Sequence, residues 1–136
     1  MKTIVLCGGR GFRLNELTED IPKSMVTIGG KPILYYICNH YKKCGFKNFI
    51  FCLGYKGNQI KEYFKKIREF DIEFVETGIN SSKTMRILTV RDLVDKEFFL
   101  TYGDDMCHIN LNSLLRFHKK HGRIATLTTV NYQSDF

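Results

Sequence analysis

Apolar residues follow two alternating patterns along the chain. In short runs of roughly four to eight residues they are contiguous or alternate with polar residues, and many are β-branched or aromatic, which is typical of buried strands. Runs of this kind predict strands at Thr3–Leu6, Phe46–Leu53, Asp71–Glu76, Phe98–Tyr102 and Arg123–Val130. Between these runs, apolar residues recur at helical spacing, which indicates amphipathic helices.

Three helices are predicted, each with start and stop signals. The first starts at Lys31–Pro32, because proline is favoured in the first turn of a helix, and Gly45 ends it. The side chains of Asn58 and Asn110 can cap the other two helices, and Gly122 ends the last one. The predicted inner faces are, in chain order, Ile33, Leu34, Ile37, Tyr41 and Cys44; Ile60, Phe64 and Ile67; and Leu111, Leu114, Leu115 and His118.

Strands that alternate with helices indicate an α/β fold with a mostly parallel sheet. We expect a Rossmann-like three-layer sandwich with helices on both faces of the sheet. The 136 residues are enough for one hydrophobic core, so residues 1–136 are predicted to form a single domain. Ligands of such sheets bind beyond the carboxyl ends of the strands. The glycine-rich loop after Leu6 and the loop Gly103–Asp105 both follow strands, so they should line one crevice.

Composition excludes several classes of protein. The chain is 43% apolar, but no segment approaches the roughly 20 apolar residues of a membrane span, and the first apolar run is too short for a secretory signal. The five cysteines are an odd number without CxxC spacing, which argues against a disulfide framework and a zinc site. We therefore expect a cytoplasmic protein with reduced thiols and no membrane partner.

The net charge of +7 favours an anionic ligand. The basic residues lie in groups on predicted helices, where a solvated face is the ordinary explanation. No nucleic-acid-binding module is recognisable, and we predict no nucleic acid partner. Attraction of a polyphosphate substrate is a sufficient use of the positive field.

The loop after the first strand has the composition of a phosphate-binding loop. Its glycines, Gly8, Gly9 and Gly11, let backbone N–H groups approach an anion because no Cβ stands in the way. Arg13 can hold phosphate oxygens through two parallel hydrogen bonds. No Gly-Lys-Ser/Thr closes the loop as in a Walker A motif, and Leu14 replaces the third glycine of a dinucleotide fingerprint. A tight turn would also use glycines, so the prediction depends on the other motifs.

Two charged residues supply those motifs. Lys23, ten residues after Arg13, can place a second positive group on an α-phosphate, where charge builds during displacement. Asp104, at the carboxyl end of a predicted strand, is placed to hold Mg²⁺. The alternative for Asp104 is a turn or helix-cap role, which is common after strands. If strand geometry persists, Asp105 points the opposite way, so Asp104 alone is the predicted ligand.

The order of these motifs resembles that of the sugar-phosphate nucleotidyltransferases, and most of all the glucose-1-phosphate cytidylyltransferase branch. The resemblance covers nearly the whole chain. It is carried by GGxGxRL at residues 8–14, Pro22-Lys23, Gly29–Ile33, Gly54–Phe64, Val75–Gly78, Thr101–Asp104, and His118–Gly122 with Ala125–Thr128.

The resemblance implies a role for each matching position. The loop that wraps the nucleotide phosphates would comprise Leu6, Cys7, Gly8, Gly9, Gly11, Phe12 and Arg13. Lys23 would contact the α-phosphate, and Gly103 would line the nucleoside pocket. Thr77 and Ser82 would touch the cytosine and the ribose. Asp104 would bind Mg²⁺, so the implied catalytic residues are Arg13, Lys23 and Asp104.

The implied activity is Mg²⁺-dependent transfer of CMP from CTP to a phosphorylated acceptor, with release of pyrophosphate. The acceptor would be a sugar 1-phosphate or another small metabolite, and the product an activated precursor of cell-surface polysaccharide. Two alternatives stay open. One is a non-catalytic nucleotide-binding or regulatory module, and the other is an NAD-type oxidoreductase, which the missing glycine disfavours.

The chain departs from the family pattern in several places. Phe12 stands where the family has Thr or Ser, Ser24 replaces the second proline of Pro-Lys-Pro-Met, and Asp105 replaces a glycine. Residues 1–136 match only the nucleotide-binding part of the family domain, without the part that supplies the acceptor pocket and a second metal-binding aspartate. The surface against which that part would pack should self-associate, so we expect a homo-oligomer.

Overall fold

The structure, a computed structural model, describes residues 1–9 and 20–131. Its main sheet has four parallel strands in the order β5-β4-β1-β6. These are β1 (Thr3–Leu6), β4 (Asn48–Leu53), β5 (Asp71–Glu76) and β6 (Phe99–Tyr102). The chain adds β4 and β5 on one side of β1 and then returns to add β6 on the other side. This change of direction falls between β1 and β6, and crevices at such switch points bind ligands.

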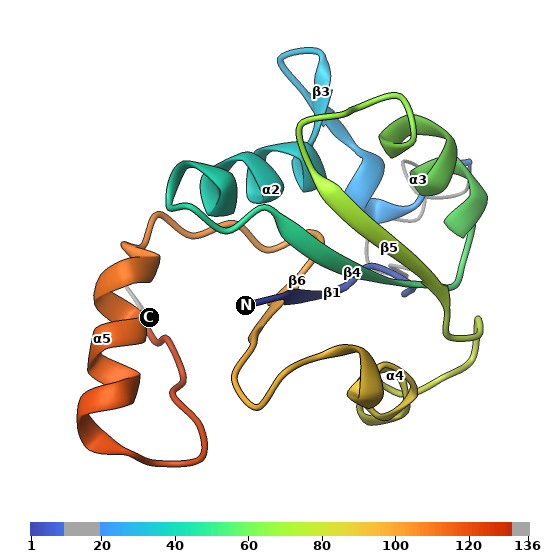
Figure 1. Cartoon of the computed structure of the whole chain (residues 1–136). Helices are drawn as coiled ribbons and strands as arrows, with labels where there is room; N and C mark the ends of the chain where they lie inside the picture. Colours follow the sequence, from blue (N-terminus) through green and yellow to red (C-terminus); the bar gives the residue numbers. More distant parts are fainter. Residues whose placement is uncertain (10–19, 132–136) are drawn as a thin grey trace, which may run out of the picture.

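Helices cover both faces of the sheet (Figure 1). On one face, α2 (Ile33–Lys43) and α3 (Gly57–Phe64) pack against β1 and β4. On the other face lie α4 (Lys83–Thr89) and the short 3₁₀ helix η3 (Arg91–Leu93). The predicted three-layer α/β sandwich is therefore confirmed.

The period-2 geometry of the strands builds two separate cores. Alternate residues of β1 and β4 point toward α2 and α3, and the residues between them point toward α4. The first core contains Val5, Phe49, Phe51 and Leu53 from the strands, with Leu34, Ile37, Cys38, Ile60 and Phe64 from the helices. The second contains Ile4, Leu6, Ile50 and Cys52, closed by Val90.

Smaller elements connect these layers. The 3₁₀ helix η2 (Lys23–Met25) precedes a two-stranded antiparallel sheet of β2 (Thr27–Ile28) and β3 (Lys31–Pro32). The last helix, α5 (Leu111–His121), lies at the C-terminal end of α2, where Asn112 Nδ2 donates to the carbonyl of Cys44 at 3.1 Å. Within the described ranges, no helix is both long and apolar enough to cross a membrane.

The two ends of α5 lie where they were predicted, whereas the start of α2 is shifted. Lys31 and Pro32, predicted to start the helix, form β3, and Pro32 is the N-cap of a helix that begins at Ile33. The side chain of Asn110 accepts a hydrogen bond from the backbone N–H of Ser113 at 3.0 Å, which caps α5. Gly122 ends α5 with a φ of 63°, a left-handed conformation that favours glycine.

The predicted start of α3 is wrong. The helix begins at Gly57 after Lys56, whose φ of 50° is left-handed, so Asn58 is already inside the first turn. A Cβ at Gly57 would lie 2.9 Å from the Cβ of Leu53, so the helix start packs directly against the end of β4. This close packing of the helix start on the end of β4, rather than an asparagine side chain, sets the boundary.

The predicted strand Arg123–Val130 is also wrong. Residues 123–131 form no strand, and Ile124, Leu127 and Val130 are almost wholly exposed. A strand exists only when a neighbouring strand satisfies its backbone groups. This segment instead turns back along α5 (Figure 1), where Thr126 Oγ1 lies 2.8 Å from His118 Nδ1 and 2.7 Å from His121 Nε2.

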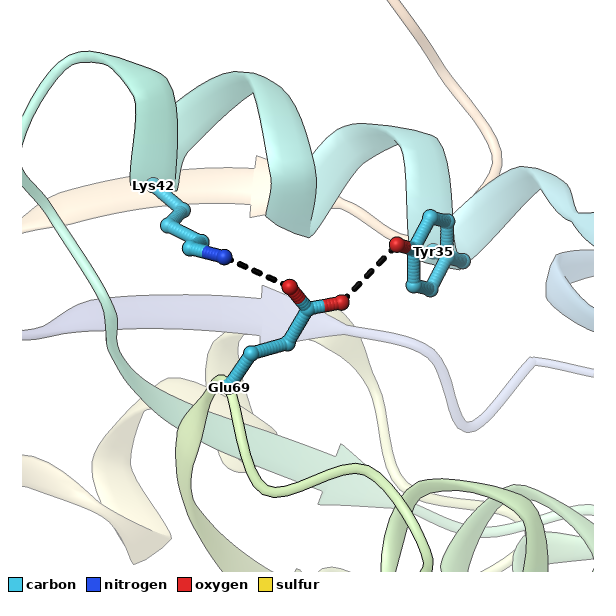
Figure 2. A network of polar contacts seen from close by, with 3 residues as sticks. All are labelled: Tyr35, Lys42 and Glu69. Atoms are coloured by element: carbon cyan, nitrogen blue, oxygen red, sulfur yellow. Dashed lines mark hydrogen bonds and ion pairs between the residues drawn. The ribbon is translucent and has the colours of Figure 1, made fainter.

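A polar network fastens α2 to the turn before β5 (Figure 2). Glu69 accepts a hydrogen bond from the Tyr35 hydroxyl at 2.8 Å and forms an ion pair with Lys42 at 2.5 Å. The Lys42 ammonium, and then the Tyr35 hydroxyl, hold the pKa of the Glu69 carboxyl below its usual range. The contact stabilises the packing of α2 and lies on the opposite face of the sheet from α4.

Candidate functional site

A cavity of about 610 Å³ opens beyond the carboxyl ends of β1 and β6, at the switch point of the sheet. The glycine-rich loop after β1 and the loop after β6 both reach it, as the sequence predicts. Its lining comprises Leu6, Cys7, Gly8, Gly9, Lys23, Ser24, Ile79, Asn80, Ser81, Ser82, Lys83, Arg86, Tyr102 and Asp104. Seven of the residues predicted for the site are thus brought together: Leu6, Cys7, Gly8, Gly9, Lys23, Ser82 and Asp104.

The two predicted charged residues meet in the cavity. Lys23 Nζ, from η2, lies 2.6 Å from Asp104 Oδ2, in the loop after β6. Both side chains are partly exposed, at 38% and 27%, so the pair adds little to stability. The ion pair matters for position, because it holds a cation and a carboxylate side by side in the cavity wall.

Asp104 could give one hard oxygen ligand to a divalent cation. Across residues 1–9 and 20–131, no three His, Cys, Asp or Glu side chains gather into a metal-binding group. Magnesium is commonly held by one or two carboxylates together with substrate phosphates. The donor set therefore fits a weak Mg²⁺ site that phosphate oxygens would complete.

Gly103 sets the position of Asp104. Its backbone N–H donates to the carbonyl of Leu6 at 3.0 Å, which continues the pairing of β6 with β1. A Cβ on Gly103 would lie 2.8 Å from the Cβ of Cys7, so only glycine fits. Gly103 thus lies behind the cavity wall, and its predicted contact with a nucleoside stays a prediction.

Cys7 lies at the base of the glycine-rich loop. Its thiol donates to the carbonyl of Cys52 at 3.5 Å. Burial raises the pKa of Cys7 far above that of an ordinary thiol. At neutral pH the side chain is protonated and does not act as a nucleophile.

Arg86, on α4, is the main site residue that the sequence did not predict. Its side chain is buried, with Nη1 donating to Leu53 O at 3.0 Å and to Thr77 Oγ1 at 2.6 Å. Nη2 donates to Gly8 O at 3.0 Å and to Ile79 O at 3.3 Å. One guanidinium therefore joins the end of β4 to the loops that follow β1 and β5.

The guanidinium also explains two of the glycines. A Cβ on Gly8 would lie 2.2 Å from Arg86 Nη1, and one on Gly54 would lie 2.8 Å from the same atom. Gly9, by contrast, faces open space, so its backbone is accessible from the cavity. Gly8 and Gly54, each just after a strand, are the signal in the sequence that could have indicated a buried side chain here, because the absence of their own side chains leaves room for Arg86.

Of the two residues predicted to contact the nucleoside, Ser82 lines the cavity and Thr77 does not. The Thr77 hydroxyl donates to Leu53 O at 2.7 Å and accepts from Arg86, and Thr77 is not part of the cavity lining. Ser82 lines the cavity, and its hydroxyl caps α4 by accepting from the Met85 N–H at 3.2 Å. Both roles stay predictions, and Ser81, which also lines the cavity, was missed.

Three predicted phosphate-loop residues, Gly11, Phe12 and Arg13, lie outside the described residues. Their predicted roles are therefore untested. In the described part, the lining carries three cations, Lys23, Lys83 and Arg86, against the single carboxylate of Asp104. A cavity with this balance attracts anions.

Comparison with known proteins shows to which family the chain with this positively charged cavity belongs. The family model described as Nucleotidyl transferase matches residues 2–135. The chain belongs to the nucleotidyl transferase family. It is 40% identical to the probable glucose-1-phosphate cytidylyltransferase of Bacillus subtilis (strain 168), over all of this chain and 63% of the relative. It is 39% identical to the glucose-1-phosphate cytidylyltransferase of Salmonella typhimurium, over 96% of this chain and 60% of the relative.

The structural comparison agrees. The crystal structure of HddC from Yersinia pseudotuberculosis, complexed with GMP-PN, superposes with a TM-score of 0.75 at 26% identity. The match covers 86% of this chain and 53% of HddC. This chain therefore spans 63%, 60% and 53% of these three relatives.

Proposed function

We propose that the cavity binds CTP and that this chain carries the nucleotide-binding machinery of a Mg²⁺-dependent cytidylyltransferase. The observation that supports it most is the Lys23–Asp104 pair, which sets the predicted α-phosphate contact and the predicted metal ligand 2.6 Å apart in one cavity. The choice of cytosine rests on the two relatives named as cytidylyltransferases, at 40% and 39% identity. A cytoplasmic location and a homo-oligomer belong to the same proposal.

The proposed reaction is in-line attack by a phosphate oxygen of the acceptor on the α-phosphorus of CTP. The bond from the α-phosphorus to the bridging oxygen breaks, and pyrophosphate leaves with the electron pair. Mg²⁺, when bound, supplies charge neutralisation on the phosphates. Lys23 stabilises the charge that builds on the α-phosphate, and the backbone N–H groups of Gly8 and Gly9 hold the departing phosphates.

No protein nucleophile takes part in this scheme. The acceptor phosphate already carries a good nucleophile, and the only thiol in the cavity lining, that of Cys7, is buried and protonated. Arg86 orients the loop by holding the Gly8 carbonyl. The acceptor would be a sugar 1-phosphate or another small phosphorylated metabolite, and the product a precursor of cell-surface polysaccharide.

A second candidate is a nucleotide-binding module without catalysis. Such a module would use the same cavity and the same Lys23–Asp104 pair to hold a nucleotide, without an acceptor. Calorimetric titration with CTP, UTP, GTP and ATP, each with and without Mg²⁺, tests binding. Pyrophosphate release with CTP and glucose 1-phosphate tests transfer.

The results separate the candidates. CTP binding strongest of the four, with pyrophosphate release that needs an acceptor, supports the transferase. CTP binding without release under any tested acceptor supports the binding module. Equal or tighter binding of another nucleotide contradicts the cytidylyl assignment and leaves the family unchanged.

A further inference from the structure

Two buried hydroxyl groups have no hydrogen-bond partner among the described residues, Thr3 Oγ1 and Ser24 Oγ. Thr3 is 0% exposed and Ser24 is 4% exposed, so neither hydroxyl faces bulk solvent. Buried polar groups are almost always hydrogen-bonded, and one that is not destabilises the fold. The two residues differ in one respect: Ser24 lines the cavity, and Thr3 does not.

Ser24 lies next to the charged pair of the cavity. It follows Lys23 in η2, and Lys23 binds Asp104. Its Cβ packs against Gly103, where an added Cβ would lie only 3.3 Å away. The Cβ of Ser24 therefore lies between the segments that carry the cation and the carboxylate. Rotation about the Cα–Cβ bond moves Oγ among staggered positions without moving the backbone.

We infer that the Ser24 hydroxyl donates a hydrogen bond to a phosphate oxygen of the nucleotide in the cavity. The inference rests on the proposed function for the identity of the ligand. A proline occupies this position in the family pattern that the sequence resembles, and proline has no donor, so the contact would be specific to this chain. Among the described residues the Ser24 hydroxyl has no partner, and a bound phosphate would supply an acceptor for it.

The effect of Ser24→Ala should therefore have opposite signs on stability and on affinity. Removal of an unpartnered buried hydroxyl should raise the melting temperature of the free protein by about 2–6 °C. Loss of a hydrogen bond to a charged group should weaken CTP binding by about tenfold to a hundredfold. Thr3→Val is the matched control, because it removes the other unpartnered hydroxyl from a site outside the cavity.

The experiment measures melting temperatures and calorimetric affinities for CTP, cytidine and inorganic tripolyphosphate on the full chain. We expect Ser24→Ala to weaken CTP and tripolyphosphate but not cytidine. We expect Thr3→Val to raise the melting temperature and leave every affinity unchanged. Weaker cytidine binding, or equal CTP binding in wild type and Ser24→Ala, would overturn the inference.

The same data separate this inference from the proposed function. If the wild type binds CTP and Ser24→Ala binds it equally well, the function stands and the inference fails. If the wild type binds tripolyphosphate in a Ser24-dependent way but shows no added affinity for CTP, the inference stands and the cytidylyl function fails. If the wild type binds none of the three, both fail.

Discussion

Replacement of Arg86 tests whether one buried side chain orders the cavity. Arg86→Met removes four hydrogen bonds that join the end of β4 to the loops after β1 and β5. At about 1.5–3 kcal/mol for each bond to a charged group, a simple sum would be comparable with the whole stability of a small domain. That sum overstates the loss, because two of the carbonyls keep another donor.

The remaining partners set a smaller magnitude. Gly8 O also accepts from the Tyr55 N–H at 3.0 Å, and Leu53 O also accepts from the Thr77 N–H at 3.0 Å. Among the described contacts, Ile79 O is therefore the carbonyl left without a donor. We expect Arg86→Met to lower the free energy of unfolding by about 2–4 kcal/mol. The free energy of unfolding of Arg86→Lys should fall between those of Arg86→Met and the wild type, because a lysine ammonium has three donors but not the planar geometry of a guanidinium.

Nucleotide binding should suffer further, because the loop that holds the phosphates loses its tether and the cavity loses a cation. We expect at least about a tenfold loss of CTP affinity per folded molecule, which corresponds to about 1.4 kcal/mol. Urea unfolding followed by circular dichroism gives the stability, and calorimetry at a temperature where the variant is folded gives the affinity.

Lys42→Met is the matched control. It removes one positive charge and one ion pair, with Glu69, away from the cavity. It should lower stability and leave CTP affinity unchanged at equal ionic strength. The reasoning is refuted if Arg86→Met destabilises the fold but retains wild-type affinity, or if Lys42→Met weakens CTP binding as much.

Two further predictions concern charged residues. Asp104→Asn should abolish the gain in CTP affinity that Mg²⁺ confers. Metal-free binding should stay level or improve, because one repulsion with the triphosphate is lost. Titrations with and without Mg²⁺ measure this, and if Asp105→Asn rather than Asp104→Asn removes the Mg²⁺ effect, the metal ligand is Asp105. Glu69→Gln should lower the melting temperature at neutral pH. The folded-state pKa of Glu69 lies below its ordinary value of 4.5, so its stabilisation is present above that value and is lost as the pH falls through the lower pKa. The difference from wild type should therefore shrink in acid, and melting curves from pH 7 to pH 3 in which the gap stays constant would contradict this origin.

Features with local causes were predicted well. The strand Asp71–Glu76 was predicted with the bounds that the structure shows, because its alternating apolar residues are bounded by turns. The ends of α5 were also predicted, because an asparagine cap and a left-handed glycine act within one turn of the chain. For the site, the glycine-rich loop and Asp104 were found from their places after strands, and Lys23 from its spacing after Arg13. The cavity brings their described parts together.

Features that depend on residues distant in the sequence were not predicted. Arg123–Val130 has the composition of a strand, but pairing depends on a partner strand that no local pattern reveals. Arg86 had no motif of its own, because its role comes from the carbonyls of Gly8, Leu53 and Ile79, which lie far apart in the chain. The start of α3 was missed for a local reason, since it depends on the packing of Gly57 against Leu53 at the end of β4, and no capping side chain marks it.

The sequence by itself therefore determined the α/β class, most strands and the charged residues of the site, because periodicity, caps and glycine geometry act over a few residues. Only the tertiary structure decided which groups meet. Parallel strand order brought the loops after β1 and β6 together, and so placed Lys23 beside Asp104. Packing from distant segments also decides the surroundings of a side chain, and so gave Arg86 four hydrogen bonds and left the Ser24 hydroxyl without a partner among the described residues.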